Sequence, residues 1–292
     1  MSQDRVVDAL PNRVRRRAVP VPLLFVISGC SLYLGAALAV VLFDQLNPAG
    51  VAWLRMLVAA LVLLAWRRPA RAVWRGRRLV RAACFGLVTG LMNVAFYEAI
   101  ARLPLGTAVA VEFCGPVAVA ALGSRRVRDV AALVLAAAGV VLIADVRLTG
   151  SGAGLLLALV AAVLWATYIV LGKQVASAGS GLDDMTVGFA LAAVLLCPLA
   201  LGTGPAWGSP TLLAMAAAVG VLSTALPYAL DQVALRRVGQ ARFALLLALL
   251  PAVASVVGLL VLGQLPHPRE AAGIATVAVA VGLSGWTDPG GR

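Results

Sequence analysis

Four charged residues interrupt long apolar runs of the chain, where a charge is costly. Arg55, Glu98, Glu112 and Asp231 each stand among mostly alanine, valine and leucine. Placing one such side chain at the centre of a lipid bilayer costs about 2.5–3.5 kcal/mol on insertion scales. A charge kept at that cost is a candidate for binding a solute or for carrying a proton.

Glu112 lies in the middle of the apolar string VAVEFCGP. Helical spacing puts it on one face with Ala108, Gly115 and Val119, and these small neighbours predict room beside the carboxylate for a ligand or water. A carboxylate in such surroundings can exchange a proton near neutral pH or hold a substrate ammonium group. The alternative is a structural ion pair, for which Arg55 is a candidate partner.

The other three charges each have a structural alternative. Arg55 stands about two turns into its apolar run, where it either binds a substrate carboxylate through its forked guanidinium or snorkels to the outer surface. Glu98 is near the outer end of its run and can reach water. Asp231 lies about one turn before Arg236 and Arg237, which favours an ion pair at the membrane interface.

Polar and aromatic side chains in the same runs are candidates for lining a chamber around these charges. Asn93 and Tyr97 are four residues apart and share a helix face. The other candidates are Trp165, Tyr168 and Tyr228. For the tyrosines and the tryptophan, the alternative is the aromatic belt at the membrane surfaces.

The elements that must position these residues are membrane-spanning helices. Of the 292 residues, 62% are hydrophobic and 12% are charged, and the mean hydropathy is +0.99, which excludes an ordinary soluble domain. Windows of about 20 apolar residues therefore predict membrane spans. The ten predicted spans are 21–43, 49–66, 79–101, 105–123, 129–145, 152–173, 185–202, 211–235, 240–263 and 269–286.

The two halves of the chain resemble each other at a constant offset of 135 residues. Tyr33 falls on Tyr168, and Pro116 falls on Pro251. Each half holds five predicted helices, an odd number, so the second copy must enter the membrane in the opposite direction. The sequence therefore predicts an all-α integral membrane protein of ten transmembrane helices in two inverted five-helix repeats, an architecture of secondary transporters. The predicted repeats cover residues 21–145 and 152–286.

Prolines and glycines inside the spans predict bends and close packing. Gly86 and Gly90 form a GxxxG pattern, which is typical of closely packed membrane helices. Each proline removes a backbone hydrogen bond and can kink its helix. The prolines inside spans are Pro116, Pro198, Pro227 and Pro251.

Basic residues are distributed unevenly among the segments that join the spans. With the first tail inside, 20 of the 24 Lys and Arg residues fall on the cytoplasmic side and 3 on the outside. This positive-inside pattern predicts that both tails, residues 1–20 and 287–292, are cytoplasmic. It also accounts for the net charge of +12 without a nucleic-acid partner, because no basic domain stands apart from the apolar runs.

The sequence has no motif for catalysis or metal binding. It contains neither an HExxH nor a GxSxG string, and its single histidine, His267, lies in a loop. The four cysteines are far apart in apolar runs and are interpreted as small buried hydrophobic residues. We therefore expect no metal, no cofactor and no intramembrane enzyme. The cysteines are Cys30, Cys84, Cys114 and Cys197.

Two strings around the charged residues resemble a known family. PLGTAVAVEFCGPVAVAALGSRR (104–126) and LSTALPYALDQVALRRV (222–238), together with the duplication, are similar to the EamA-type drug/metabolite transporter superfamily. Within it, the strings are most similar to bacterial threonine/homoserine exporters. The likeness covers residues 20–286.

The resemblance implies proton-driven export of small amino acids or related metabolites through a central cavity between the repeats, across the inner (plasma) membrane. Glu112 matches the acid of the family pattern, Arg55 matches its basic residue, and Asp231 matches a position that is usually acidic. Glu98 departs from the pattern, which is uncharged there.

The leading hypothesis is therefore a secondary transporter whose partners are a small solute, protons and the lipid bilayer. A second hypothesis is an exchanger of drug-like or nucleotide-sugar-like solutes. A large anionic solute would need several cations in the cavity, and only Arg55 qualifies as one. An intramembrane enzyme is a distant third.

Overall fold

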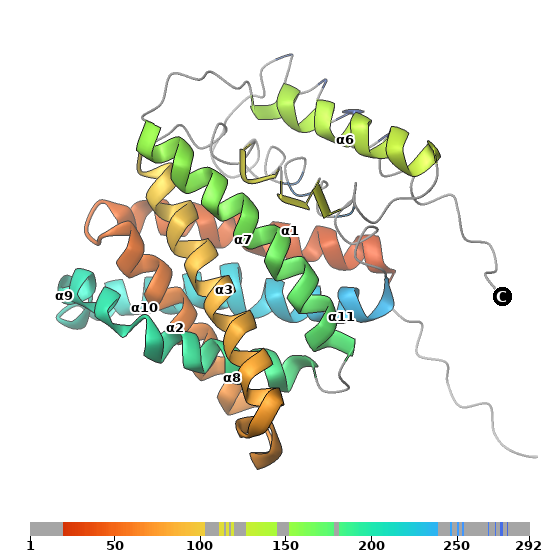
Figure 1. The fold of residues 1–292 in the computed structure, drawn as a ribbon. Coiled ribbons are helices and arrows are strands. Elements are labelled where there is room, and N and C mark those ends of the chain that lie inside the picture. Colours follow the sequence, from red (N-terminus) through yellow and green to blue (C-terminus); the bar gives the residue numbers. More distant parts are fainter. Residues whose placement is uncertain are drawn as a thin grey trace, which may run out of the picture.

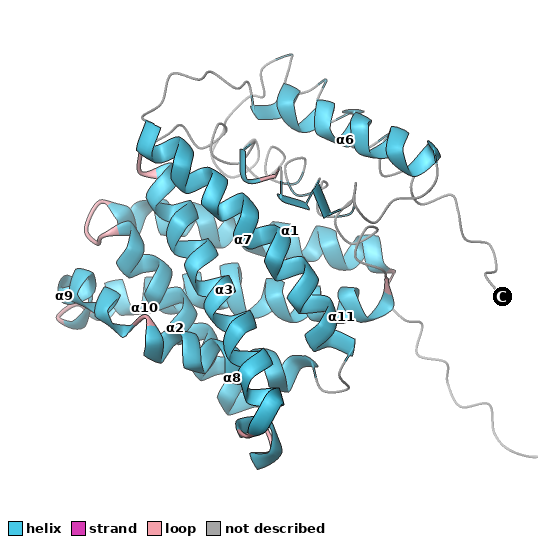
Figure 2. Cartoon of the chain, viewed as in Figure 1, coloured by secondary structure: helices cyan, strands magenta, loops and turns pink. Residues whose placement is uncertain are grey.

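The structure, a computed structural model, consists of helices joined by short loops in the residues that it describes, without a strand among them (Figure 2). The all-α prediction is therefore confirmed for this part of the chain. The described residues are 20–102, 111–113, 115–116, 118–119, 127–144, 152–177 and 181–238, with the single positions 246, 250, 253, 268, 272, 275, 276 and 279.

Five stretches of helix within these residues are long and apolar enough to cross a membrane. They coincide within a few residues with the first, second, third, sixth and eighth predicted spans, because long uninterrupted apolar runs define them. The stretches are α1 (Val21–Phe43), α2 (Pro48–Arg67), α3 (Gly76–Ile100), α7 (Gly152–Ser177) and the continuous run of α10 (Pro210–Gly220), the π-helical turn η3 (Val221–Ala225) and α11 (Leu226–Arg237).

The seventh predicted span, 185–202, is a sharply bent pair of helices instead of one helix. α8 (Gly181–Leu195) is followed by a 3-10 helix, η2 (Cys197–Thr203), and by the short α9 (Gly204–Trp207). The two parts meet at 66°. Pro198 stands in the first turn of η2 and has no N–H to continue the hydrogen bonding of α8, so the kink expected there is a full bend.

The remaining predicted spans fall partly or wholly outside the described residues. α6 (Val127–Ala144) occupies the fifth span. The fourth, ninth and tenth spans, over 105–123, 240–263 and 269–286, lie outside the described residues except for scattered positions. The number of ten helices therefore stays a prediction.

Polar residues followed by proline start two of the helices. The Asn47 side chain accepts a hydrogen bond from the backbone N–H two residues on (2.9 Å), and Ser209 Oγ accepts one from the N–H three residues on (3.3 Å). Pro48 and Pro210 follow directly, and their fixed φ suits the first helical position. These pairs determine where α2 and α10 begin.

α3 packs closely against α7 and α8 (Figure 1). Part of its contact with α8 is made by backbone atoms, and the rings of Phe85 and Phe189 stack beside it. A Cβ added at Gly86 would lie 1.9 Å from the Gly188 carbonyl oxygen, and one added at Gly188 would lie 2.3 Å from the Ala82 carbonyl oxygen. Since only glycine allows this approach, the GxxxG pattern that begins at Gly86 is a close-packing face, as predicted.

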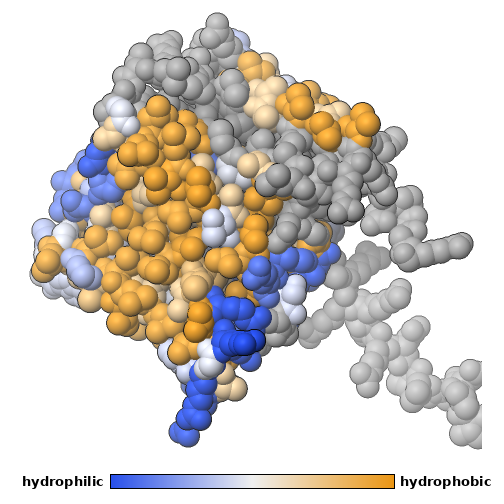
Figure 3. Space-filling view, viewed as in Figure 1, coloured by the Kyte–Doolittle hydropathy of each residue, from blue (hydrophilic) through white to orange (hydrophobic). Residues whose placement is uncertain are grey.

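The outer face of the described bundle is hydrophobic. The surface over α3 and α7 is mostly apolar, and hydrophilic residues gather at its margins (Figure 3). Cys84 and Cys197 are exposed instead of buried as expected, because a small apolar side chain suits lipid as well as a protein core. Among the arginines between α2 and α3, the chain forms a short 3-10 helix, η1 (Arg71–Trp74).

Candidate functional site

The helical hydrogen bonding of the second half is interrupted at η3, and this interruption leaves backbone carbonyls for side chains of the site to bind. At the end of η3 a backbone N–H reaches back five residues, and Pro227, which follows, has no N–H. The carbonyls of Leu222 and Ser223 thereby lose their usual partners four residues on. Two side chains from the first half replace them: Ser31 Oγ donates to Leu222 O (2.6 Å), and Arg55 donates to Ser223 O (2.8 Å).

Arg55 is buried in the bundle, with 4% of its surface exposed. Its guanidinium donates to Thr224 Oγ1 (2.8 Å), to the Ser223 carbonyl and to the Tyr97 hydroxyl, and Cζ lies 4.9 Å from the Tyr97 ring centroid. The snorkelling alternative is therefore wrong, because these groups hold the side chain inside. All three hydrogen-bond partners are neutral, so the positive charge of Arg55 is oriented but not cancelled.

Asn93 and Tyr97 share one face of α3, as their spacing predicts, and point toward Tyr228 and Arg55 respectively. The Asn93 amide donates to the Tyr228 hydroxyl on α11 (3.2 Å) and to Thr89 O in its own helix (2.8 Å). Both side chains are buried. The structure thus brings Arg55, Asn93, Tyr97 and Tyr228 together.

Asp231 is buried on α11, about one turn beyond the tyrosine of that helix. The Tyr168 hydroxyl on α7 donates to its carboxylate (3.1 Å). This neutral donor replaces the ion pair that the sequence favours. Arg236 donates to the Ala176 carbonyl instead (2.8 Å), because it lies on the exposed side of α11 while the carboxylate faces the interior.

Aromatic rings join these polar pairs. The rings of Tyr168 and Tyr228 meet edge to face with centroids 5.4 Å apart, and Phe189 meets Tyr228 in the same way at 5.5 Å. Tyr97, Tyr168 and Tyr228 are each at most 8% exposed, so the membrane-belt alternative is wrong for them. We refer to the following six residues as the central cluster: Arg55, Asn93, Tyr97, Tyr168, Tyr228 and Asp231.

Glu112 is buried beside this cluster and interacts electrostatically with Arg55 and with Tyr33 on α1. In the described part of the chain no salt bridge joins it to Arg55, so the structural ion pair is not formed. The space predicted on its helix face is partly filled. A Cβ added at Gly115 would lie 2.1 Å from the Ala162 carbonyl oxygen, so the backbone of α7 occupies that side.

Trp165 and Glu98 lie at the margin of the site. Trp165 is half-buried and meets Phe113, the neighbour of Glu112, edge to face (4.9 Å), so it packs this segment against α7. Glu98 pairs with Arg102 at the end of α3 (2.5 Å), where both side chains are partly exposed. This agrees with the expectation that Glu98 reaches water.

Three hydroxyl residues belong to the site but are not predicted from the sequence. Ser28 and Ser31 on α1 donate to backbone carbonyls of the broken helix, and Thr224 receives a hydrogen bond from Arg55. The signal is weak: Thr224 is four residues before Tyr228, and the serines are three apart in an apolar run. Ser and Thr also occur where membrane helices simply pack together, so spacing alone does not distinguish the two roles.

The polar groups of the site suit the binding of a charged solute. Across the residues that the structure describes, no cluster of three or more His, Cys, Asp or Glu could hold a metal ion. The central cluster and Glu112 together offer a guanidinium, two carboxylates, an amide and phenol hydroxyls, contributed by both halves of the chain. Buried polar groups of both signs match a small solute that carries both charges.

Comparisons with known proteins point to one family. Residues 152–286 match the EamA-like transporter family. The threonine/homoserine exporter RhtA of Salmonella typhimurium (strain LT2) is 38% identical over 264 residues, which cover 87% of this chain and 88% of the relative. RhtA of Escherichia coli (strain K12) is 34% identical over 280 residues, 93% of each chain.

A solved structure, described only as the crystal structure of a protein, has the same fold. Its TM-score is 0.71 at 18% sequence identity, over 90% of this chain and 94% of its own. The curated relatives are similar over nearly their whole length, and the described helices are long and apolar enough to span a membrane. The chain therefore belongs to the EamA-like transporter family and is a membrane transporter of small molecules, not an enzyme.

Proposed function

We propose that this transporter exports a small zwitterionic amino acid of the threonine or homoserine kind across the bacterial inner membrane, driven by protons moving inward. The observation that carries the proposal is the uncancelled charge of Arg55, buried within electrostatic range of Glu112. The relatives support the solute class, since both are threonine/homoserine exporters.

Arg55 binds the carboxylate of the solute in this proposal. A guanidinium has five N–H donors, and three of them are used by described residues. The other two can form a forked pair of hydrogen bonds to a carboxylate. Asn93, Tyr97, Tyr168 and Tyr228 supply hydrogen bonds for a side-chain hydroxyl, and Trp165 closes the wall near Glu112.

Glu112 couples the solute to the proton, with Asp231 as the second acid of the path. A carboxylate holds an ammonium group when ionised and releases it when protonated, so the proton and the solute compete for one group. Glu112 is free of a salt bridge to Arg55 within the described residues, which leaves it open to this exchange. Competition of this kind gives export against proton entry.

The architecture that we propose is ten helices in two inverted repeats, residues 21–145 and 152–286, with both tails in the cytoplasm. The family match supports it, because it covers 152–286, the bounds of the second repeat. The site also draws on both halves, as a chamber between repeats must. The tails, 1–20 and 287–292, are placed inside by the excess of arginine on that side.

Glu112→Gln is the decisive variant. In inside-out vesicles, export appears as accumulation of radiolabelled threonine or homoserine inside the vesicle. We expect gradient-driven accumulation to fall by about 100-fold or more, because glutamine cannot take up or release a proton. A 100-fold loss is equivalent to about 2.7 kcal/mol. Normal gradient-driven accumulation by Glu112→Gln would remove the coupling role.

Glu98→Gln is the matched control, since Glu98 is paired with Arg102 at a helix end. It should transport within about twofold of the parent, because an exposed ion pair contributes little.

Competition with threonine methyl ester, which lacks the carboxylate charge, tests the role of Arg55 in the same vesicles. A drug-like or nucleotide-sugar-like solute that displaces threonine more strongly would overturn the proposed solute class.

A further inference from the structure

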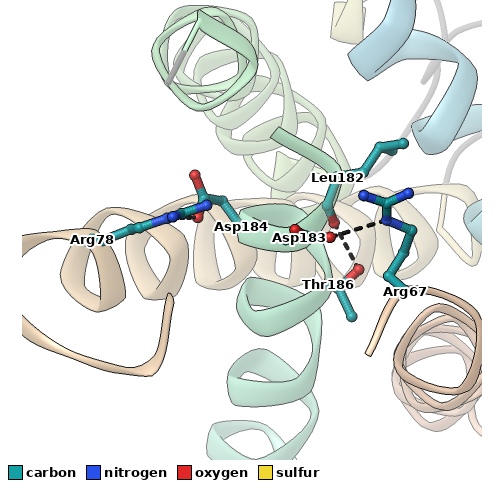
Figure 4. A network of polar contacts seen from close by, with 6 residues as sticks. All are labelled: Arg67, Arg78, Leu182, Asp183, Asp184 and Thr186. Carbon is teal, nitrogen blue, oxygen red and sulfur yellow. Dashed lines mark hydrogen bonds and ion pairs between the residues drawn. The ribbon is translucent and has the colours of Figure 1, made fainter. Parts of the chain in front are cut away.

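At one end of the bundle, two arginines of the first half hold the first turn of α8. Arg67 Nε, at the end of α2, lies 3.0 Å from Asp183 Oδ1, and Arg78 Nε, near the start of α3, lies 2.5 Å from Asp184 Oδ1. The two arginines reach this turn from opposite sides (Figure 4). We refer to these two ion pairs as the α8 latch.

The two pairs of the latch differ in burial. The Asp184 side chain is 4% exposed and that of Arg78 is 28% exposed, whereas Asp183 and Arg67 are 17% and 35% exposed. Water screens an exposed pair more than a buried one, so the Arg78–Asp184 pair contributes more to the latch. Both acids also stand in the first turn of α8, where the helix dipole favours a negative charge.

One turn beyond the latch, α8 touches α3 through backbone atoms at Gly188 and Gly86. The rings of Phe85 and Phe189 stack beside this contact, with centroids 6.2 Å apart, so the crossing is fixed and a movement of the first turns of α8 would pivot there. The segment of α8 from Gly181 to this crossing is therefore a short lever, held at its free end by the latch.

α7 and α11 are tied to each other at the same end of the bundle. Lys173 of α7 donates to the carbonyls of Leu235 (2.5 Å) and Val238 (2.7 Å) at the end of α11. Arg236 of α11 donates in return to Ala176 O of α7 (2.8 Å). Because these bonds cap both helix ends, α7 and α11 form one body against which the lever of α8 can move.

A buried side chain that has no hydrogen-bond partner among the described residues lies next to the first residue of α8. The amide nitrogen and oxygen of Gln232 are both buried, and neither makes a hydrogen bond in the described structure. Added Cβ atoms at Gly181 of α8 and Gly172 of α7 would lie 3.2 Å from its Oε1 and 3.6 Å from its Nε2. An unpaired buried amide destabilises the arrangement that contains it, and an arrangement in which water or a solute pairs the amide is free of this cost.

We propose that the first turn of α8 is the cytoplasmic gate of the transporter, that Arg67 and Arg78 latch it shut, and that opening it uncovers Gln232 as a further solute-binding group. Gln232 follows Asp231 directly on α11, so a solute leaving the central cluster toward the cytoplasm meets it next. An amide offers both a donor and an acceptor, which suits the hydroxyl or carboxylate of an amino acid. The inference rests on the proposed function for the solute and on the arginine count for the side.

Thiol labelling at position 232 tests the gate. In a chain whose native cysteines are replaced by serine, Gln232→Cys is treated with a small membrane-impermeant thiol reagent on the cytoplasmic face of inside-out vesicles. Adding Arg78→Gln should speed labelling about tenfold or more, since the buried pair no longer holds the lever. Arg102→Gln, which breaks the pair with Glu98 at the other end of α3, should leave the rate unchanged.

The charge-swapped chain, Arg78→Asp with Asp184→Arg, should return labelling to the slow rate of the parent. This separates an opened latch from a misfolded one. Equal labelling with and without Arg78→Gln would overturn the gate, and so would fast labelling of the charge-swapped chain with a native melting midpoint. The rates require no solute, so this result stands apart from the test of the proposed function.

Gln232→Leu tests the binding role. With whichever amino acid the parent transports, we expect transport to fall about tenfold while the melting midpoint stays level or rises, because an unpaired buried amide has been removed. A purely structural glutamine would lower the midpoint instead. Normal transport by Gln232→Leu, or a lower midpoint, would overturn the assignment of Gln232 while leaving the role of Glu112 intact.

Discussion

The central cluster and the α8 latch both connect the first half of the chain to the second, but they treat charge in opposite ways. At the latch, Arg78 faces Asp184, and the two charges cancel. In the central cluster, Arg55 is held by a hydroxyl, a phenol and a carbonyl, none of which carries a charge. The nearby acid Asp231 is likewise held by the neutral Tyr168.

This difference separates contacts that hold the protein together from contacts that can bind a solute. A cancelled pair presents little field to its surroundings. A charge that is oriented by neutral dipoles keeps its field, and in a poorly polarisable interior that field is strong. The proposed binding site therefore lies where the buried charges are hydrogen-bonded to neutral groups.

Arg55→Lys should break the central cluster most severely. A lysine ammonium has three donors around a point charge and cannot hold three neutral partners while forming a fork to a carboxylate. We expect transport to fall about 100-fold, the equivalent of about 2.7 kcal/mol. Initial rates in vesicles, divided by the amount of transporter in the membrane, measure the effect. Full transport by this variant would mean that the charge suffices without the fork.

Gly188→Ala should disturb the crossing of α3 and α8, which lies between the central cluster and the α8 latch. The added methyl group would lie 2.3 Å from a backbone oxygen of α3, so the helices must separate. We expect a loss of about 1–3 kcal/mol in stability, as for overpacking in a core. Thermal unfolding in detergent measures it, with Gly204→Ala as the control because a Cβ there would meet nothing within 4 Å. Equal midpoints for the two variants would contradict the close crossing.

Arg67→Gln should have the smallest effect. Its pair with Asp183 is the more exposed of the two in the latch, at 35% and 17%. We expect a change of about 0–1 kcal/mol in the same unfolding assay, because water and salt screen such a pair. If its effect equalled that of Arg78→Gln, burial would not be what distinguishes the two pairs.

Much of the fold follows from hydropathy alone. The predicted span 21–43 is α1, and 152–173 lies inside α7, because an uninterrupted apolar run leaves the backbone no alternative to a helix in lipid. The bend after α8 was indicated by Pro198, but a proline in the sequence does not give the size of the bend, which is 66°. Hydropathy alone therefore predicted one span over 185–202, where the structure has α8 followed by η2.

Most charged and aromatic residues of the candidate site were predictable one by one, but Ser28, Ser31 and Thr224 were not, and neither were the connections between residues. Helical spacing placed Asn93 and Tyr97 on one face, and both do point into the site. Spacing within a helix gives no information about which helix lies opposite, so the hydrogen bond from Arg55 to Thr224, 169 residues away, could not be foreseen. The snorkelling alternative for Arg55 was wrong for the same reason.

The π-helical turn η3 makes the two parts of one membrane-spanning helix face different directions. A turn with one extra residue shifts everything after it by about 100° relative to a regular α-helix. Upstream of η3, Leu212 and Val219 stay on the side that packs into the apolar core. Downstream, Tyr228 and Asp231 are turned toward Asn93 and Tyr168. The same helix thus packs into the apolar core in its first part and carries Tyr228 and Asp231 of the proposed site in its second, and the five residues of η3 separate the two.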